Sequence, residues 1–144
     1  MAKRKEPVKA PDKKPYQVFV SHATADKWLA KVLCEKIEDT GATSFRDDRD
    51  IKGGDDIPDE IRRHMKKSHE LMVLLTPESV GRQWVTLEVG AMWGRSNRIR
   101  IVIVLCHVPV DPIPTMLKNK KAIPLNDLDQ YLSELKDRVR SYYG

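Results

Sequence analysis

Two hydrophobic periods alternate along this chain. Short apolar runs, of the length expected for β-strands, are separated by segments in which apolar residues recur every three or four positions, the spacing of a helix packed on a core. The runs predict five strands, at residues 16–21, 42–46, 70–76, 99–106 and 121–125. The periodic segments predict four helices, at residues 24–41, 56–65, 79–94 and 126–142.

The strands at 70–76 and 99–106 are almost unbroken apolar runs. Such strands are buried on both faces, which is typical of a parallel sheet between two layers of helices. The alternation of strands and helices therefore predicts an α/β fold, a flavodoxin-like doubly wound sheet of five parallel strands with helices on both faces. Ligands of such sheets bind beyond the carboxyl ends of the strands. The turn at 21–23, the loop at 46–56 and the segment 76–82 leave those ends and are expected to converge there.

The first and last helices carry the clearest boundary signals. Thr24 is expected to cap the first helix and Gly41 to end it, and Asn126 is expected to cap the last helix. The inner stripe of the first helix is predicted to contain Trp28, Leu29, Val32, Leu33 and Ile37, and that of the last helix Leu128, Leu132, Leu135, Val139 and Tyr142. Cys34 and Cys106 fall in a helix and a strand and are expected to be reduced core residues.

The segment 79–94 carries two helical patterns. Val85, Val89, Met92 and Trp93 form a buried stripe, and Gly94 follows the last apolar position. Trp84 and Glu88 are four residues apart, so they meet on an adjacent face of the same helix. Two interpretations follow: Trp84 covers the edge of the core beside a solvated Glu88, or the pair forms a ring wall and a charge that face a ligand.

Composition indicates one domain. The 144 residues are 40% hydrophobic and 33% charged. No apolar run approaches the ~20 residues of a membrane span, and the basic N-terminus lacks the apolar core of a secretory signal. We expect a disordered basic tail at 1–15, a folded domain at 16–144 and a cytoplasmic location. The tail holds a charge of +4 out of a total of +5; the folded part is nearly neutral, so binding of nucleic acid by the domain is not expected.

Several kinds of site are excluded by missing motifs. The chain has neither the Gly-x-Gly-x-x-Gly dinucleotide fingerprint nor a P-loop. Its four histidines and two cysteines lack metal-ligand spacing, so no metal site is expected. Residues 47–56 do not have calcium-loop spacing, no Gly-x-Ser-x-Gly elbow is present, and the acidic positions of a phospho-receiver are occupied by Ser21, His22, Thr76 and Pro77.

Three short motifs together resemble one family. Phe19–Ala23 resembles the first box of Toll/interleukin-1 receptor (TIR) domains, and Phe45–Asp47 with Ile51–Ile57 resembles the second. Ser79–Glu88 resembles the third, including the Trp-x-x-x-Glu of the enzymatic members. The resemblance extends over residues 16–142 and is closer to bacterial TIR proteins than to animal adaptors. The second box lacks the proline typical of animal adaptors and has Gly53 and Gly54 in that region, which argues against the adaptor style of contact.

The resemblance implies cleavage of the nicotinamide–ribose bond of NAD⁺, with NAD⁺ as substrate and no cofactor. By position, Glu88 is the catalytic glutamate and Trp84 packs by the ligand. The substrate-binding residues implied by the first two boxes are Phe19, Ser21, His22, Ala23, Arg46, Asp47 and Ile51. The products would be nicotinamide and ADP-ribose, a cyclic isomer or a transferred ADP-ribose. The resemblance also implies self-association through TIR–TIR contacts, with the loop 47–56 of a neighbouring copy completing the site, a sensor or effector partner, and a role in anti-phage defence.

Two other functions fit the same sequence. One is a non-catalytic TIR scaffold, in which the loop and helix faces bind other TIR domains. The other is an enzyme like the nucleoside deoxyribosyltransferases, which are also doubly wound and hold a carboxylate near a ribose. Glu88 separates the scaffold from the enzymes, because a scaffold has no need of a carboxylate four residues after Trp84.

Overall fold

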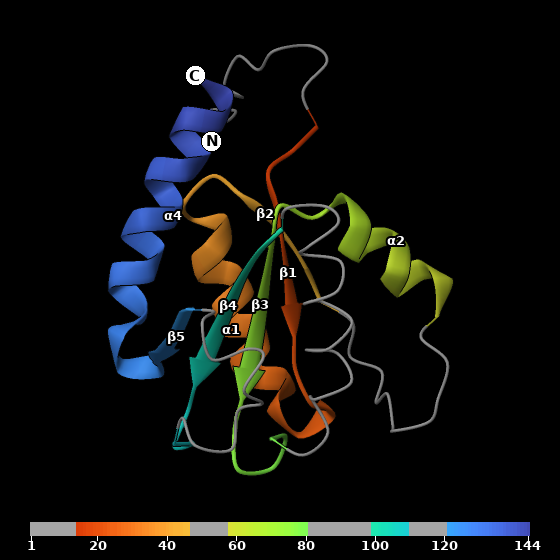
Figure 1. Cartoon of the computed structure of the whole chain (residues 1–144), viewed down its shortest axis with the longest axis vertical. Coiled ribbons are helices and arrows are strands. Elements are labelled where there is room, and N and C mark those ends of the chain that lie inside the picture. Colours follow the sequence, from red (N-terminus) through yellow and green to blue (C-terminus); the bar gives the residue numbers. More distant parts are fainter. Residues whose placement is uncertain (1–13, 47–57, 81–98, 110–120) are drawn as a thin grey trace, which may run out of the picture.

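The computed structural model of the chain describes residues 14–46, 58–80, 99–109 and 121–144. These residues form a five-stranded sheet (Figure 1). The strands are β1 (Gln17–Ser21), β2 (Thr43–Arg46), β3 (Glu70–Leu75), β4 (Arg100–Leu105) and β5 (Lys121–Pro124). All four pairings are parallel, and the order across the sheet is β2-β1-β3-β4-β5. The predicted fold class, a doubly wound parallel sheet, is confirmed.

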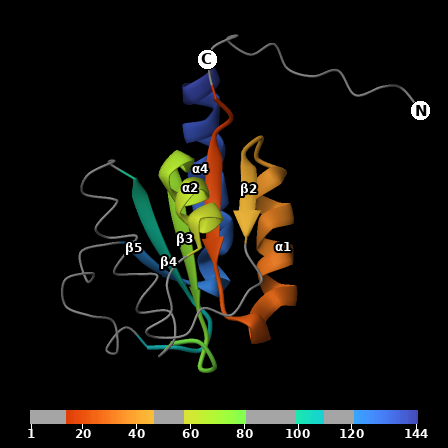
Figure 2. The same ribbon diagram turned by 90° about the vertical axis from the view of Figure 1, so that its right-hand side faces the viewer.

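Helices cover both faces of this sheet. They are α1 (Lys27–Glu38), α2 (Asp59–Lys67) and α4 (Leu128–Tyr143), with short 3₁₀ turns at Thr24–Asp26 and Leu125–Asp127 before α1 and α4. The helices α1 and α4 pack on one face of the sheet and α2 packs on the other. Figure 1 shows α4 and α2 on opposite sides of the strands, and Figure 2, turned by 90°, shows the strands side by side from β5 to β2. Of the helix predicted at 79–94, only residues 79 and 80 lie within the described part of the chain.

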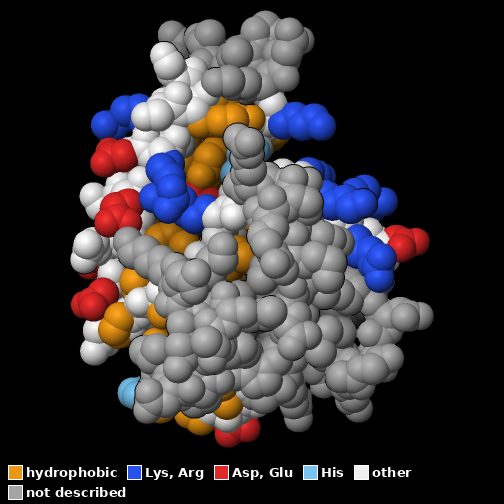
Figure 3. Space-filling view, viewed as in Figure 1, with side chains coloured by type: hydrophobic (Ala, Val, Ile, Leu, Met, Phe, Trp, Pro, Cys, Tyr) orange, Lys and Arg blue, Asp and Glu red, His pale blue; other side chains and the backbone are white. Residues whose placement is uncertain are grey.

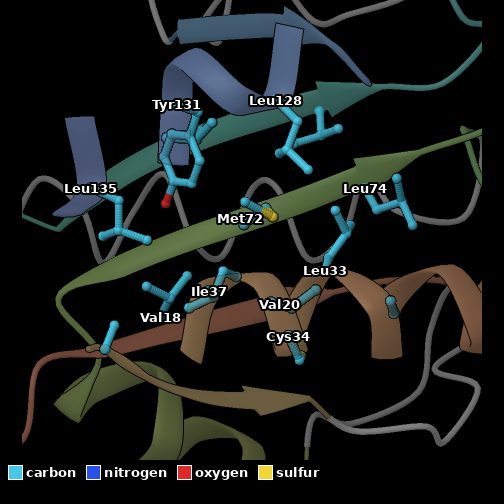
Figure 4. Close-up of a cluster of buried hydrophobic side chains, with 14 of the residues drawn as sticks. Val18, Val20, Leu33, Cys34, Ile37, Met72, Leu74, Leu128, Tyr131 and Leu135 are labelled. Atoms are coloured by element: carbon cyan, nitrogen blue, oxygen red, sulfur yellow. The ribbon is translucent and has the colours of Figure 1, made fainter. Parts of the chain in front are cut away.

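The two faces follow from the two-residue period of the strands. Met72 and Leu74 of β3 point toward α1 and α4, whereas Leu71, Val73 and Leu75 point toward α2. Figure 4 shows the first cluster, in which Val18 and Val20 of β1 meet Leu33 and Ile37 of α1. Every residue of β3 is buried. The continuous apolar pattern of this strand thus reflects a central position between two cores.

Two predicted helix caps were wrong. Thr24 begins a 3₁₀ turn and α1 starts at Lys27, while Asn126 lies inside the second 3₁₀ turn and α4 starts at Leu128. Each helix is therefore preceded by one tighter turn, in which the polar residue takes helical rather than capping backbone angles. Gly41 does end the α1 region as predicted, with a left-handed φ of 100° that favours glycine.

The predicted inner stripe of α1 was also partly wrong. Trp28 is 74% exposed. The buried positions of α1 are Ala30, Leu33, Cys34 and Ile37, at spacings of three, one and three, with Leu29 and Val32 only partly buried. The two cysteines are free, and Cys34 is buried as expected, whereas Cys106 at the end of β4 is only half-buried.

A buried ionic cluster lies where β3 begins. Glu70 is fully buried, and its carboxylate accepts hydrogen bonds from Arg138 Nε at 2.8 Å and Nη2 at 3.1 Å. The Tyr131 hydroxyl donates to the same carboxylate at 2.7 Å, and the Tyr16 hydroxyl donates to its other oxygen. Burial, together with the Glu70 carboxylate, raises the pKa of both tyrosines. Burial alone would lower the pKa of Arg138, but its contact with Glu70 outweighs burial and raises it.

Candidate functional site

The topology of the sheet defines where a ligand binds. From β1 the chain crosses by α1 to β2 at one edge, and then returns by α2, on the opposite face, to β3 on the other side of β1. The strand order therefore reverses between β1 and β3. In doubly wound sheets of this order the ligand crevice lies at this switch point, outside the carboxyl ends of the two strands. Those ends are Ser21 in β1 and Leu75 in β3.

The turn after β1 is buried and held by its own backbone. Ser21, His22 and Ala23 are each less than 10% exposed. The Ala23 carbonyl accepts a hydrogen bond from His22 Nδ1 at 2.7 Å and another from the Asp26 amide at 2.9 Å. A carbonyl only accepts, so Nδ1 carries the imidazole proton of this contact. The end of the first predicted motif thus forms a buried turn, held by hydrogen bonds, at the switch point.

A polar network joins this turn to the end of β3. The Thr76 hydroxyl donates to Asp26 Oδ2 at 2.7 Å, across the switch point. The Ser79 hydroxyl, fully buried, accepts from the Thr76 amide at 2.8 Å and lies 3.2 Å from the Thr76 hydroxyl. The backbone amides of Ser79 and Val80 both donate to the Thr76 carbonyl at 3.0 Å. Asp26, Thr76 and Ser79 therefore fix the direction in which the chain leaves β3.

Removing the Ser79 hydroxyl is expected to loosen this turn. In Ser79→Ala the buried Thr76 amide loses its acceptor, and an unsatisfied buried donor costs about 1–3 kcal/mol of unfolding free energy. The measurement is urea denaturation followed by circular dichroism. Ser133→Ala, at an exposed position of α4, is the control and is expected to change stability by less than about 0.5 kcal/mol. Equal stability of the two variants would contradict the structural role of Ser79.

Of the predicted substrate-binding residues, Phe19 and Arg46 lie apart from the polar turn. Phe19 is 3% exposed and packs in the core under α2, with its ring centroid 5.3 Å from that of Phe45. Arg46 ends β2 beside Val20 and is half-buried in a groove of about 410 Å³ between α1 and β2, which Lys31 also lines. Contact of the Phe19 ring or the Arg46 side chain with a substrate stays a prediction.

The other predicted site residues lie outside the described part of the chain. They are Asp47 and Ile51 of the loop, and Trp84 and Glu88 of the third motif. The structure brings the carboxyl ends of β1 and β3 together, and β3 ends nine residues before Trp84 in the sequence. The roles of these four residues as substrate contacts and as catalyst are therefore taken up below as proposals.

Two features of this edge were not predicted. Asp26 was not singled out, because its partner Thr76 is 50 residues away in the sequence. His107, two residues beyond β4, has a left-handed backbone with φ of 61°, and among the described residues it is the non-glycine residue with positive φ. Histidine adopts this conformation more readily than most residues, so a histidine directly after an apolar strand was the available signal.

The described segments offer neither a metal centre nor a membrane span. No group of three or more histidine, cysteine, aspartate or glutamate side chains within them is arranged to hold a metal ion. Among the helices of these segments, none is both long and apolar enough to cross a bilayer.

The sheet order, the buried turn after β1 and the motif order define a TIR-type domain. The sequence profile of the TIR domain matches residues 18–138, and the chain belongs to this family. Its named relatives include the 2' cyclic ADP-D-ribose synthase BtTIR of Bacteroides thetaiotaomicron, 26% identical over 96 residues, which are 65% of this chain and 33% of the relative. The TMV resistance protein N of Nicotiana glutinosa is 24% identical over 126 residues, 86% of this chain and 11% of that protein. The chain thus spans half or less of the length of these relatives.

Solved structures support the same fold. The metazoan TIR-STING receptor from C. gigas superimposes with a TM-score of 0.59 and 24% sequence identity, over 90% of this chain and 40% of the receptor. A structural likeness with this low sequence identity establishes the fold, and the fold alone does not assign an activity.

Proposed function

We propose that this protein cleaves the bond between nicotinamide and ribose in NAD⁺, with Glu88 as its catalytic residue. The observation that supports the proposal most directly is that the buried turn of Ser21, His22 and Ala23 lies at the switch point beside the segment 76–79, through which the chain leaves β3. From Ser79, which follows β3, Trp84 is five residues further along the chain, and Glu88 follows four residues later. Membership of the TIR family and similarity to a cyclic ADP-ribose synthase support the same reaction.

One carboxylate is enough for this chemistry. Glycosidases usually need two, because a sugar-oxygen leaving group must be protonated as it departs. The nicotinamide of NAD⁺ already carries a positive charge, so the electron pair of the broken bond leaves it neutral. The ribose becomes an oxocarbenium-like cation, which the Glu88 carboxylate stabilises electrostatically. Trp84 supplies a flat apolar wall for a ring of the substrate.

The acceptor of the ADP-ribosyl group decides the product. Attack by water, with loss of a proton, gives ADP-ribose. Attack by an atom of the same molecule gives a cyclic isomer, and attack by a hydroxyl or amine of another molecule gives a transferred adduct. The phosphates and ribose are expected to lie near Ser21–Ala23 and to meet Phe19, Arg46, Asp47 and Ile51 of the first two motifs.

Self-association is part of the proposal. We place the loop 47–56 of a neighbouring copy at the site, so that the active species is an assembly in the cytoplasm, which a sensor or effector protein triggers in anti-phage defence. The chain needs NAD⁺ as substrate and no cofactor.

Nicotinamide release is expected to rise more than linearly with protein concentration. If two copies build one site, the rate per molecule increases until assembly is complete. Nicotinamide is measured by chromatography after incubation with NAD⁺ over at least a hundredfold range of protein. A rate per molecule that stays flat would contradict the shared site, and absence of release at every concentration would favour the non-catalytic scaffold.

A further inference from the structure

A second charged surface lies away from the switch point. A groove of about 720 Å³ is lined by Lys14 before β1 and by residues of α2. The α2 residues in its lining are Asp59, Arg62, Arg63, Lys66 and Lys67. Lys14 lies three residues before β1, and Lys66 and Lys67 lie shortly before β3, so the groove is at the end of the sheet where these strands begin, opposite the carboxyl-end crevice.

The charge of this groove is strongly one-sided. Among the described residues, its lining has five cations and one carboxylate, a formal charge of +4. The chain from residue 16 onward is almost neutral as a whole, which is why nucleic-acid binding was not expected from the sequence, but this net charge does not reveal a local basic surface. Arg62, Arg63, Lys66 and Lys67 are all exposed, and they repeat at four-residue spacing along α2. Within the described residues, none of these four is in an ion pair of 4 Å or less. Figure 3 shows the blue side chains gathered over α2.

The two walls of the groove are tied together. The Tyr142 hydroxyl donates to the Lys14 carbonyl at 2.6 Å and holds that wall. The side-chain amide of Gln17, three residues after Lys14, donates to Ser68 Oγ at 2.8 Å and to the His64 carbonyl at 3.3 Å, both at the end of α2. The backbone that carries these cations is therefore held in place before a ligand binds. This lowers the entropic cost of binding a polyanion.

We propose that this groove, defined by Lys14 and the α2 cations, binds the phosphate backbone of a nucleic-acid duplex without reading its sequence. A concave surface with charge on two walls fits a rod of phosphates better than a flat bilayer. Among the described residues, the lining has no apolar side chain to insert into lipid and no aromatic ring on which an unpaired base could stack. Lysine and arginine contacts to phosphate position a protein on a duplex but carry no sequence information.

Binding of a duplex in this groove is expected to weaken steeply as the salt concentration rises. If the four α2 cations each neutralise one phosphate, log affinity falls with log salt at a slope of about −3.6, so binding weakens about 150-fold between 50 and 200 mM salt. Twenty-base-pair DNA and RNA duplexes of arbitrary sequence, carrying a fluorescent label, are titrated with the full chain and followed by anisotropy. If only phosphates are recognised, both duplexes are expected to bind, with an affinity that does not change with base sequence. A preference for the DNA or the RNA duplex would identify which of the two is the natural partner.

Two variants that lose the same number of positive charges distinguish binding in the groove from attraction by net charge alone. The test variant replaces Arg62, Arg63, Lys66 and Lys67 by glutamine. The control variant replaces four exposed cations of α1 and α4 by glutamine: Lys31, Lys36, Lys136 and Arg140. These lie on the opposite face of the sheet, where salt screens their effect on the groove. Glutamine preserves helix propensity, and thermal melts confirm that both variants fold.

The test variant is expected to lose at least about 100-fold in duplex affinity at 50 mM salt, and the control less than about fivefold. Equal losses in both variants would overturn the proposal, because only net charge would then matter. Binding to vesicles of phosphatidylserine and phosphatidylcholine without binding to either duplex would also overturn it, in favour of a membrane surface. Tighter binding to a single strand than to a duplex would exclude duplex recognition. The result does not depend on NAD⁺ cleavage.

Discussion

Replacing Glu88 by alanine is expected to reduce nicotinamide release from NAD⁺ by at least about 100- to 1,000-fold, the usual effect of removing one group that stabilises transition-state charge. The proposed reaction has no general acid, and the leaving group departs unaided once the ribose cation is stabilised. The whole electrostatic contribution therefore rests on one carboxylate. The loss is expected in the turnover rate at saturating NAD⁺, because the charge develops only in the transition state.

Two further variants identify the charge of Glu88 as the cause. Glu88→Gln retains the size of the side chain and removes its charge, so it is expected to be nearly as inactive as Glu88→Ala. Glu78→Ala removes an exposed carboxylate from the turn after β3, and it is expected to retain activity. Circular dichroism and melting temperatures establish that all three remain folded. Full activity of Glu88→Gln would show that charge at this position is not needed, and would refute the mechanism.

The sheet could be predicted from the sequence because its strands are buried on both faces. The continuous apolar residues of β3 and β4 leave no polar side for solvent, and that pattern alone selects a parallel sheet between helices. Pro124 was expected at an edge, since proline cannot donate to a neighbouring strand, and β5 is the edge strand. These local rules are sufficient for the fold class and for one edge of the sheet, whereas the full strand order comes from the structure.

The helix faces were less predictable, because small residues carry part of the core. In α1 the inner face includes Ala30 and Cys34, which a search for large apolar residues passes over. Counting Trp28 instead shifted the predicted stripe toward solvent. Hydrophobicity identifies a side chain that gains from burial, but packing against β1 and β2 selects the face.

The candidate site was predictable only as an edge of the sheet. The predicted ends of the strands indicated that Ser21 and Thr76 lie near one another, because parallel strands end at the same edge of the sheet. The contact between Asp26 and Thr76 could not be predicted, since nothing local links residues 50 apart. For the same reason Glu70 was read as the first residue of an apolar strand, although Arg138, its partner, is 68 residues further along.

Replacing Arg138 by methionine is expected to lower the free energy of unfolding by about 3 kcal/mol, the lower end of the range for breaking a buried ion pair. Glu70 is fully buried, so without the guanidinium its remaining partners among the described residues are the Tyr16 and Tyr131 hydroxyls. The lower end applies because the Arg138 side chain is 22% exposed, which lets water reach the altered position. Methionine retains most of the apolar stem of arginine, and the loss therefore reports on the charge.

A double-mutant cycle separates the buried charge from lost packing. Glu70→Gln removes the charge that needs a partner, and its amide oxygen still accepts from a tyrosine hydroxyl. The double variant Glu70→Gln/Arg138→Met is thus expected to be more stable than Arg138→Met alone, with a coupling energy of about 1–3 kcal/mol in urea denaturation. Arg140→Met, two residues away and in an exposed pair with Asp137 at 3.9 Å, is the control and is expected to change stability by less than about 0.5 kcal/mol. If Arg138→Met matched this control, Glu70 would be stabilised by its tyrosine partners and by water, and the ion pair would contribute nothing to the link between β3 and α4.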